Sequence, residues 1–559
     1  MWMIQALGFP NLIPYIFYIQ KILLVGNITV YLLLNQINID MNISRNQSRI
    51  LERYLNKNKS ELANITKEDL IDLFEKIILK NEQNFILLSD GYKYSHHKFY
   101  TPGLTKLTSY MESRGGKFKE TVFFGLQYIL KKYFVGKVIS QEMIDEAFEK
   151  LQGKDGVFGP EGSFSKEKWE SLLKKHDGYL PLRIKAVPEG TVVTTKNILM
   201  LIESTDDEFA WLTGFVESIL LQVWYPITVA TLSREVKKIV KHYLKITGCD
   251  PATIDIVAEF ILNDFGFRGV SSVESASIGG AAHLVNFMGS DNTVGSDMLI
   301  DYYNTNIMWG KSIDATEHSI CTMEGEKGEI DVFRRVLLSK PKGIVACVSD
   351  SFNILRACMK YWGEDLKDII LARDGVLVIR PDSGHVIMTL KKVFEILFDK
   401  FGYTINSKGF KVLPPQVRVI QGDGVNLDSI NEMYEELMKE GIAAENLVLG
   451  MGGKLLQAGI DRDTCNFAIK ACNAIINGNS FDIEKSPTEI DENGEIHASF
   501  KKSKKGIPKL VKTEINFKTL TNIHEGYDEA IDELVPVFEN GFLLQDYKFE
   551  NIRNLAKVV

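Results

Sequence analysis

The sequence lacks the patterns that identify several common classes of protein. Its six cysteines form no C-x-x-C pair and have no zinc-ligand spacing, which argues against the usual structural zinc motifs. A formal net charge of -8 provides no basic field for duplex nucleic acid, so we expect no nucleic-acid partner. No Pro/Gly/Ser-rich linker or low-complexity tract divides the chain after residue 84. With 45% hydrophobic and 25% charged residues, the composition predicts a globular protein of a reducing compartment, the cytoplasm.

The first 40 residues contain only two charged side chains, Lys21 and Asp40. Their apolar run at 22–34, ILLVGNITVYLLL, is too short to cross a bilayer. Joined to residues 11–20 it would place Lys21 near the middle of the membrane, at a cost of about 3 kcal/mol. Neither a secretory nor a mitochondrial targeting pattern is present. We interpret residues 1–83 as an N-terminal extension, apolar to residue 40 and then polar with a helix at 67–80. Membrane contact through residues 1–40 is the less favoured alternative.

A repeated layout in the second half of the chain predicts a parallel sheet. Four segments run from a short β-branched strand into Asp or Gly: GIVACVSDS (343–351), GVLVIRPDSG (375–384), VRVIQGDGV (417–425) and NLVLGMGGK (446–454). Amphipathic segments of helical length, such as 352–366 and 427–441, lie between them, as expected for parallel strands covered by helices. Loops at the carboxyl ends of such strands converge on one face, where barrel enzymes have their sites.

The residues at these strand ends favour a ligand that carries phosphates and a sugar. They are Asp350, Arg380, Asp382, Asp423, Gly452 and Gly453, and two earlier segments (263–272 and 283–295) add Asp264, Phe265, Arg268 and Asp291. Carboxylates suit ribose hydroxyls and Mg²⁺, whereas Arg, Lys and backbone N–H groups suit phosphates. Any one Asp-Gly turn is more often a plain loop, but four in succession favour a site.

Two further segments bear on phosphate binding. GMGGKLLQ (450–457) is neither a Walker loop nor G-x-G-x-x-G, so it does not support an ATPase or dinucleotide fold, although its amides could face a phosphate. SIDATEHS (312–319) predicts a helix entry with Asp314 as the cap and Glu317 at the third position of a capping box. His318 would then lie in the first turn, where it could contact or accept a phosphate.

A third segment, 484–513, combines EIDENGE with KKSKKG and predicts an exposed loop.

Ten short segments follow one another between residues 84 and 555: SDGYKYSHHKFYTPG, YMESRGG, ETVFFGLQYIL, WYPITVAT, NDFGFRGVSS, ATEHS, VSDS, IRPDSG, VIQGDGV and KKSKKG. Together they closely resemble the nicotinamide phosphoribosyltransferase family, in which the first 83 residues have no counterpart. The resemblance implies a type II phosphoribosyltransferase fold in one catalytic unit, 84–559. This unit is an α/β protein with an irregular α/β barrel (about 231–480) and a β-rich domain made of 84–230 and C-terminal segments.

The resemblance also implies an activity and a set of residues for the pyridine ring. The family transfers phosphoribosyl from phosphoribosyl pyrophosphate to nicotinamide, a step of NAD salvage that forms nicotinamide mononucleotide and pyrophosphate with Mg²⁺. It works as a homodimer with shared active sites. Phe265 would stack on one face of the ring and Tyr92 of the partner subunit on the other. Asp291 would accept from the carboxamide N–H, and Arg380 would lie beside the ring and the phosphates.

The remaining roles are implied in the same way. Asp350, Asp382 and Asp423 would serve the ribose and the metal, with Asp350 and Asp382 as the metal ligands. His318 would be phosphorylated from ATP, and with Asp350, Arg380 and Asp382 it forms the expected catalytic set. The expected phosphate-binding residues are Arg114, Arg268, Asp423, Gly452, Gly453, Arg462, Lys470, Lys504 and Lys505. Three departures from the family pattern, Ala346, Ala468 and Lys454, bear on the detail of phosphate binding.

The residue chemistry agrees with this activity but leaves alternatives. A pyridine nitrogen is already a nucleophile, so no Ser-His-Asp or Cys-His pair is needed. Leaving pyrophosphate needs Mg²⁺ and cations, and carboxylates offset the oxocarbenium-like charge. A nicotinate phosphoribosyltransferase is the nearest alternative; Asp291 disfavours it, because burying two carboxylates together costs several kcal/mol. An inactive binding or signalling protein on the same fold is the second alternative.

Overall fold

The computed structural model describes residues 83–499 and 501–558. The apolar run at 22–34 and the predicted helix at 67–80 therefore lie outside the described residues. The chain divides into two compact units. The smaller contains Lys131–Pro181, Asn540–Phe542 and the described part of Met1–Ser95, and the larger contains His96–Leu130, Leu182–Glu539 and Leu543–Val559.

The smaller unit is mainly helical. It contains η2 (Phe85–Leu87), α7 (Gln141–Gln152), α8 (Lys166–His176) and the first residues of η3 (Gly91–Lys98). Ser140 and Ser165 begin α7 and α8 because their hydroxyls accept from backbone N–H groups three residues later. The Phe85 and Phe134 rings meet edge to face, with centroids 5.5 Å apart. Tyr92 lies in η3 with 62% of its surface exposed.

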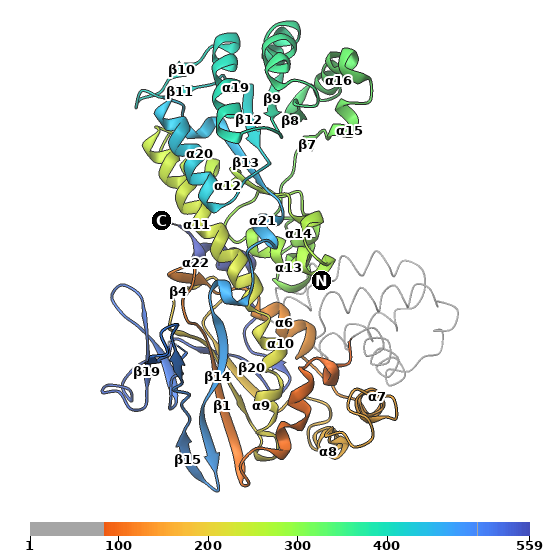
Figure 1. Cartoon of the computed structure of the whole chain (residues 1–559), viewed down its shortest axis with the longest axis vertical. Coiled ribbons are helices and arrows are strands. Elements are labelled where there is room, and N and C mark those ends of the chain that lie inside the picture. The colour runs from red at the N-terminus through yellow and green to blue at the C-terminus, as the bar shows by residue number, and fades with distance from the viewer. Residues whose placement is uncertain (1–82, 500, 559) are drawn as a thin grey trace, which may run out of the picture. The chain divides into compact units, whose positions relative to one another are not determined.

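The larger unit contains an antiparallel sheet built from both ends of the chain (Figure 1). Its strand order is β15 (Asn479–Asp482), β14 (Phe467–Ile476), β1 (Leu104–Ser113), β5 (Ile198–Ser204), β3 (Leu182–Ala186), β20 (Val535–Glu539) and β21 (Phe542–Leu543). Four two-stranded pairs accompany the two large sheets: β2 (Glu120–Val122) with β4 (Val192–Thr194), β10 (Thr404–Ile405) with β11 (Lys411–Val412), β16 (Thr488–Ile490) with β17 (Ile496–Ala498), and β18 (Pro508–Lys512) with β19 (Phe517–Thr521).

The same unit contains a parallel sheet of six strands. The order is β6 (Leu262–Asp264), β13 (Leu447–Met451), β12 (Val417–Gln421), β9 (Asp374–Arg380), β8 (Lys342–Val348) and β7 (Asp314–Ala315). Isolated parallel bridges pair Asp264 with Ser290 and Gly289 with Lys311, three residues before β7. These short segments connect the two edge strands, which confirms the predicted irregular α/β barrel.

The barrel interior is apolar, as the β-branched runs predict. Ala346, Val378 and Ile420, from three neighbouring strands, form a buried cluster, and Phe265 packs against it. Each large aliphatic side chain buried in this way contributes about 1.5–3 kcal/mol to folding. Ala346, one of the departures from the family pattern, is thus part of the barrel core and is only 6% exposed.

Helices connect the strands. Helix α6 (Leu126–Tyr133) begins in the larger unit, and its residues from Lys131 onward belong to the smaller one. The other helices of the larger unit are α9 (Leu212–Phe215), α10 (Glu217–Leu221), α11 (Trp224–Ile246), α12 (Ile254–Glu259), α13 (Val273–His283), α14 (Thr293–Tyr302), α15 (His318–Cys321), α16 (Gly325–Ser339), α17 (Ile354–Arg356), the π-helix η6 (Ala357–Asp365), α18 (Lys367–Ala372), α19 (Val386–Phe401), α20 (Leu427–Lys439), α21 (Gly453–Leu456) and α22 (Phe549–Ala556). Short 3-10 turns complete the list: η4 (Asp207–Phe209), η5 (Phe267–Gly269), η7 (Ala444–Asn446) and η8 (Arg462–Thr464).

Helix α11 contacts both the β2–β4 pair and helix α20, which precedes β13 of the parallel sheet. The hydroxyl of its Thr231 accepts a hydrogen bond of 3.0 Å from the Val122 backbone in β2. Further along the same helix, the Tyr243 ring stacks on Tyr434 of α20, with ring centroids 5.4 Å apart. Among the described residues no single helix is long and apolar enough to cross a membrane; the bent pair Asp207–Phe215 and Glu217–Ile246 meets only the length and composition criteria.

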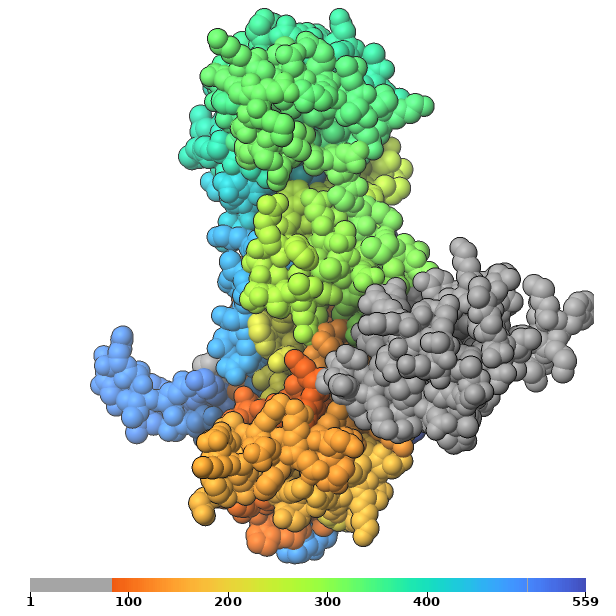
Figure 2. Space-filling view, turned by 90° about the vertical axis from the view of Figure 1, so that its right-hand side faces the viewer, coloured from red at the N-terminus to blue at the C-terminus, as the bar shows by residue number. Residues whose placement is uncertain are grey.

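The prediction of an exposed loop at 484–513 is only partly correct. The acidic half forms the β16–β17 hairpin, whose strands are exposed throughout and whose surface is visible in blue in Figure 2. The basic half packs against the antiparallel sheet instead. Ser503 is 5% exposed, and the Lys504 backbone donates a 2.7 Å hydrogen bond to the Tyr110 hydroxyl. A run of lysines does not reveal this, because the buried partners lie far away in the sequence.

Candidate active site

A continuous series of contacts links four of the predicted residues where the barrel strands end. His318, at the start of α15, places its Nε2 3.1 Å from Oδ1 of Asp350, which follows β8. The other oxygen of Asp350 accepts a 3.1 Å hydrogen bond from the Asp382 backbone after β9. The Asp350 side chain is 3% exposed whereas His318 is 49% exposed. Asp350 therefore holds the His318 ring at its Nε2 edge, while the rest of the ring remains partly open to solvent.

Arg380 extends this series to the aromatic ring. Its Nη2 lies 2.9 Å from both oxygens of Asp382, and its Nε donates to Oδ1 at 3.2 Å. The guanidinium carbon lies 5.8 Å from the centroid of the Phe265 ring. A side chain at Gly422, after β12, would come within 3.3–3.4 Å of Arg380 and Asp382. The neighbouring Asp423 is exposed at this same turn.

Phe265 rests against a glycine that leaves room for it. Its backbone N–H donates to the Met451 carbonyl at 3.0 Å, which ties the end of β6 to β13. A Cβ atom on Gly450 would lie 2.1 Å from the ring, so any side chain there would displace it. Nearby, a Cβ on Gly269 would meet the Gly453 backbone at 2.8 Å. The turn that carries Arg268 thus lies against the Gly452–Gly453 turn.

Asp291 lies beside the end of β6. Its backbone N–H donates to the Asp264 carbonyl at 3.0 Å, and its Oδ1 accepts a 2.6 Å hydrogen bond from the Ser312 hydroxyl. Asp291 is exposed, so its carboxylate can meet a ligand. Burial raises the pKa of Asp264 to about 6, although Gly266 N–H (2.7 Å) and the Asn292 amide (3.0 Å) both donate to it.

The predicted capping box before His318 is wrong. Asp314 and Ala315 form strand β7, in register with Val345 and Ala346 of β8, and the N-cap of α15 is Glu317. Backbone pairing with β8 keeps this segment extended, so Asp314 cannot cap a helix; its carboxylate pairs with Lys340 at 2.6 Å instead. The placement of His318 in the first helical residue agrees with the prediction.

The predicted phosphate-binding cations lie in separate parts of the larger unit: the barrel end, the antiparallel sheet and η8. Arg268 lies at the barrel end, whereas Arg114 and Lys504 lie on the antiparallel sheet around Glu112. Lys470 is on β14 of that sheet and Lys505 is next to Lys504. Arg462 is exposed in η8 and pairs with Asp463 at 3.0 Å. Tyr92 belongs to the smaller unit. We call Glu112 with its partners Arg114, Lys504 and Tyr110 the Glu112 group. No hydrogen bond or ion pair in the described chain joins the Glu112 group to the series from His318 to Phe265.

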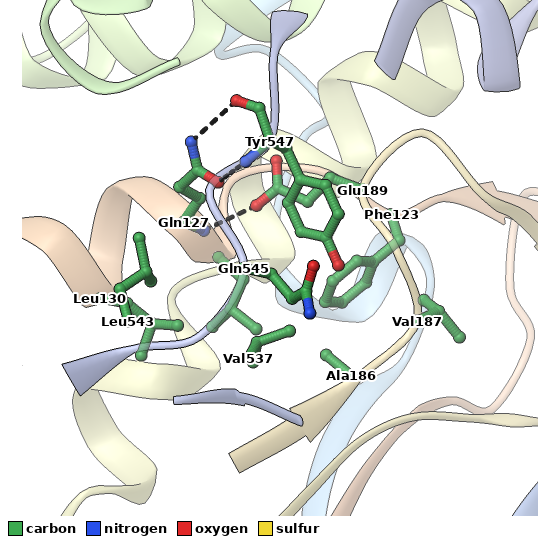
Figure 3. Close-up of a pocket in the computed structure, with 11 residues that line it drawn as sticks. Phe123, Gln127, Leu130, Ala186, Val187, Glu189, Val537, Leu543, Gln545 and Tyr547 are labelled. Carbon is green, nitrogen blue, oxygen red and sulfur yellow. Dashed lines mark hydrogen bonds between the residues drawn. The ribbon is translucent and has the colours of Figure 1, made fainter. Parts of the chain in front are cut away.

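A small cavity lies elsewhere in the larger unit and is lined by none of the predicted residues (Figure 3). Part of its polar wall is bonded within the chain, whereas the buried hydroxyl of Tyr547 has no hydrogen-bond partner among the described residues. Glu189 accepts from the Gly125 and Gln127 backbones at 3.2 and 2.6 Å. The Gln127 amide exchanges hydrogen bonds of 3.1 and 2.6 Å with the Tyr547 backbone. These bonds fix the start of α6 and the segment before α22, so we assign the cavity a role in packing.

The residues expected to hold a metal are carboxylates with other partners. Asp350 contacts His318 and an amide, one at each oxygen, and Asp382 accepts twice from Arg380 at Oδ1 and once at Oδ2. Both Asp350 oxygens and Oδ2 of Asp382 therefore retain a lone pair for a cation. Oxygen donors of this kind suit Mg²⁺, which keeps several waters and phosphate oxygens. Among the described residues, a different group, Asp491, Glu495 and His497, has ligand atoms within 4.8 Å of one another on the exposed hairpin.

Sequence reasoning missed two residues that contact the predicted set. Ser312 orients Asp291, and Glu112 pairs with Arg114 and Lys504. Ser312 lies one residue before the end of an apparent loop, and Glu112 lies in a strand that reads as ordinary structure. The YMESRGG segment places Glu112 two residues before Arg114, which is the only local signal for it.

Comparison with known proteins identifies the family of this chain. A model of the nicotinamide phosphoribosyltransferase N-terminal domain matches residues 84–184, and a model of the nicotinate phosphoribosyltransferase (NAPRTase) family matches residues 260–522. The nicotinamide phosphoribosyltransferase of Xanthomonas campestris pv. campestris (strain 8004) is 41% identical over 476 residues, which cover 84% of this chain and 97% of that protein. This chain belongs to the nicotinamide phosphoribosyltransferase family. The family member from Acinetobacter baylyi (strain ATCC 33305 / BD413 / ADP1) is 30% identical over 497 residues, or 83% of this chain and 95% of that one.

A solved structure shows the same fold at low sequence identity. The nicotinate-nucleotide pyrophosphorylase from Pyrococcus furiosus superimposes with a TM-score of 0.52 at 14% identity, covering 85% of this chain and 95% of that one. This comparison supports the fold alone. Within the nicotinamide phosphoribosyltransferase family, the predicted type II architecture of barrel plus antiparallel sheet is thus confirmed.

Proposed function

We propose that this protein transfers phosphoribosyl from phosphoribosyl pyrophosphate to nicotinamide, forming nicotinamide mononucleotide and pyrophosphate in NAD salvage. The observation that carries the proposal is the contact series His318–Asp350–Asp382–Arg380–Phe265 at the strand ends, in a chain of this family. It combines an aromatic face, a cation and two carboxylates in the way that a ring, a phosphate and a ribose require.

The ring nitrogen attacks the anomeric carbon of the ribose as the bond to pyrophosphate breaks. No protein base is needed, because that nitrogen carries a free lone pair. Phe265 supplies one stacking face and Tyr92 of the partner subunit the other. Asp291, oriented by Ser312, accepts from the carboxamide N–H of nicotinamide. Holding the two reactants in line accounts for a large part of the rate.

The phosphates of the substrate meet cations and backbone amides. Arg380, Arg268 and the Gly452–Gly453 turn belong to the barrel end, and Arg114, Arg462, Lys470, Lys504 and Lys505 complete the proposed set. Asp350 and Asp382 would hold Mg²⁺ together with diphosphate oxygens, and the ion would neutralise charge on the leaving group. Asp423, exposed beside Arg380, would bind the ribose.

His318 is proposed to accept a phosphoryl group from ATP. Its Nε2 faces the Asp350 carboxylate, so the tautomer that donates there leaves Nδ1 with a lone pair. An exposed ring held on one side by a buried carboxylate can meet a nucleotide phosphate on the other. The contact with Asp350 and the exposure of the ring support this proposal.

A homodimer and a cytoplasmic location are parts of the same proposal. Tyr92 and the cations around Glu112 would come from the partner subunit, since no contact in the described chain joins the Glu112 group to the series that ends at Phe265. The six cysteines are all free and buried, which is typical of proteins from reducing compartments.

The test compares nicotinamide and nicotinate as substrates of the purified chain with phosphoribosyl pyrophosphate and Mg²⁺. We expect kcat/KM for nicotinamide to exceed that for nicotinate by about hundredfold or more, because Asp291 repels a second carboxylate. Asp291→Asn should narrow this ratio by about tenfold or more. Mononucleotide formation measured by chromatography gives both constants.

The matched control is Asp314→Asn, which removes an exposed carboxylate of β7 that pairs with Lys340 and touches none of the proposed site. It should leave the ratio unchanged. Equal use of the two pyridines by the wild type would make the protein a nicotinate-using or unselective enzyme. Failure to release pyrophosphate with either pyridine would instead indicate a binding protein on this fold.

A further inference from the structure

A buried carboxylate on the antiparallel sheet holds two cations from opposite ends of the catalytic unit. Glu112 of β1 is 2% exposed. Its Oε1 accepts a 3.2 Å hydrogen bond from Nε of Arg114, and its Oε2 pairs with Nζ of Lys504, 392 residues further along the chain. Such a group costs several kcal/mol to bury unless each charge is paired.

The hydroxyl of Tyr110 completes this arrangement. It donates to Oε1 of Glu112 at 3.4 Å and accepts from the Lys504 backbone at 2.7 Å. Nζ of Lys504 lies 5.6 Å from the centre of the Tyr110 ring. Burial raises the pKa of Tyr110 well above its usual range, so the hydroxyl stays protonated and can play both parts. The backbone of Lys504 is thus held as well as its side chain.

The group has more positive charge than it uses internally. Arg114 and Lys504 carry two charges against one on Glu112. Lys470 lies opposite Tyr110 and Ala468 opposite Glu112 in the β1–β14 register, so both face the same side of the sheet as the carboxylate. Nη2 of Arg114 is buried and has no hydrogen-bond partner in the described chain. A buried donor without a partner costs free energy, and on a cationic guanidinium a phosphate oxygen would satisfy it.

We propose that Glu112 is a positioning residue that holds Arg114 and Lys504 for a phosphate group of phosphoribosyl pyrophosphate. Glu112 does not touch the substrate; it fixes the direction of the guanidinium and the height of the ammonium group above the sheet. The free Nη2 of Arg114 and the neighbouring Lys470 then face the phosphate. Ala468 leaves space opposite Glu112 where a larger side chain would crowd it. This inference rests on the proposed function for the identity of the substrate.

The test is Glu112→Gln, which keeps the shape of the side chain but places an amide against Lys504. We expect KM for phosphoribosyl pyrophosphate to rise about tenfold or more, equivalent to about 1.4 kcal/mol. KM for nicotinamide and kcat should change less than about threefold. A purely structural defect would not separate the two substrates in this way.

Glu203→Gln is the matched control. Glu203 lies in β5 of the same sheet and also pairs with two cations, Lys106 at 2.8 Å and Arg183 at 3.2 Å. It should leave both KM values unchanged. An equal rise in KM for phosphoribosyl pyrophosphate in the two variants, or an equal rise for both substrates in Glu112→Gln, would overturn the proposal.

A double-mutant cycle with Arg114→Lys tests whether Glu112 acts through its partner. If it does, Glu112→Gln should raise KM much less in the Arg114→Lys background than in the wild type, whereas additive effects would contradict the proposal. Calorimetric titration with inorganic pyrophosphate needs no turnover. Weaker binding by Glu112→Gln than by Glu203→Gln would support the positioning role even if the wild type failed to use nicotinamide, and equal binding would refute it.

Discussion

Asp350 and His283 illustrate how single residues hold the site. Asp350 joins two strand-end loops, because one oxygen contacts His318 and the other accepts from the Asp382 backbone. His283 of α13 supports the segment that leads to Asp291. Its Nε2 lies 3.1 Å from the Gly289 carbonyl and its Nδ1 3.1 Å from the Ser233 hydroxyl. The ring is fully buried, which disfavours its protonated form.

The first residue-scale prediction concerns the pH dependence of stability. Burial lowers the pKa of His283 to about 3, with Lys237 and Arg553 adding to the effect and the Gly289 carbonyl opposing it. Below pH 6.5 the unfolded chain therefore binds a proton that the folded chain does not, and stability is lost as the pH falls from 6.5 towards 3. Between pH 8 and pH 5 this single group should cost about 2 kcal/mol.

His283→Gln tests this, since Gln can keep both hydrogen bonds without titrating. Urea unfolding at pH 8 and pH 5 should show a smaller acid-induced loss of unfolding free energy in the variant, by about 2 kcal/mol. Asp264 acts in the opposite direction, because its pKa is raised to about 6 and its stabilising contribution is lost as the pH rises through that value. It is present in both proteins and cancels. An identical pH dependence in the two would show that His283 is not the titrating group.

Strand β13 shows how a whole element shapes the proposed ring site. It pairs with β6 through Leu449, Gly450 and Met451, in register with Leu262, Asn263 and Asp264. Phe265 follows directly and turns its ring over the strand, where Gly450 leaves the necessary gap. The sequence NLVLGMGGK predicts the strand, and its β-branched run does so reliably. It does not reveal that the Phe265 ring packs against Gly450, because Phe265 lies 185 positions earlier in the chain.

Gly450→Ala should displace the Phe265 ring, since the new Cβ would lie 2.1 Å from it. We expect KM for nicotinamide to rise about tenfold and the unfolding free energy to fall by about 1–3 kcal/mol. KM for phosphoribosyl pyrophosphate should change little. Val376→Ala is the control, because Val376 packs against the same interior cluster from β9, a different strand from the one that contains Gly450. It should lose about 2 kcal/mol of stability and keep its KM for nicotinamide. Unchanged pyridine affinity in Gly450→Ala would remove Phe265 from the ring site.

On the scale of the whole molecule, the larger unit gathers its sheets from distant parts of the chain. Strand β1 pairs with β14 more than 350 positions away, and β3 pairs with β20 over a similar separation. The barrel lies between these partners in the sequence, from Leu262 to Met451. The strands of the antiparallel sheet thus come from both sides of the barrel segment in the sequence. This explains why no linker marks a boundary between the sheet and the barrel. It also places the Glu112 group on a different sheet from the series that begins at His318.

The proposed sharing of active sites between two subunits leads to a prediction for mixed dimers. Tyr92→Ala and Asp382→Ala should each abolish most activity. If Tyr92 serves the partner subunit's barrel, a hybrid dimer contains one site with both changes and one intact site. Co-expression with random pairing should then restore about a quarter of the wild-type activity. If each site belongs to one chain, every site in the mixture carries a defect, and the activity measured after co-purification will stay at the level of the single variants.

Several features of the candidate site were predictable because they depend on local order. Parallel strands end at one edge, so Asp350, Arg380 and Asp382 could be grouped from their positions after apolar runs. Asp314 could not be placed in this way. A two-residue strand has no periodic signal, and its pairing with β8 overrides the capping tendency of its side chain.

By itself, the sequence determined the order of strands and helices in the barrel, the acids and cations at the strand ends and the likeness to a family, because these depend on runs and motifs within a few residues. Only the tertiary structure decided which of those groups touch. In the folded chain Glu112 pairs with Lys504, the Phe265 ring packs against Gly450, and Asp314 forms part of a strand. Each of these contacts joins segments that are distant in the sequence, so no local pattern predicts it. Burial and backbone pairing determine these contacts when the chain folds.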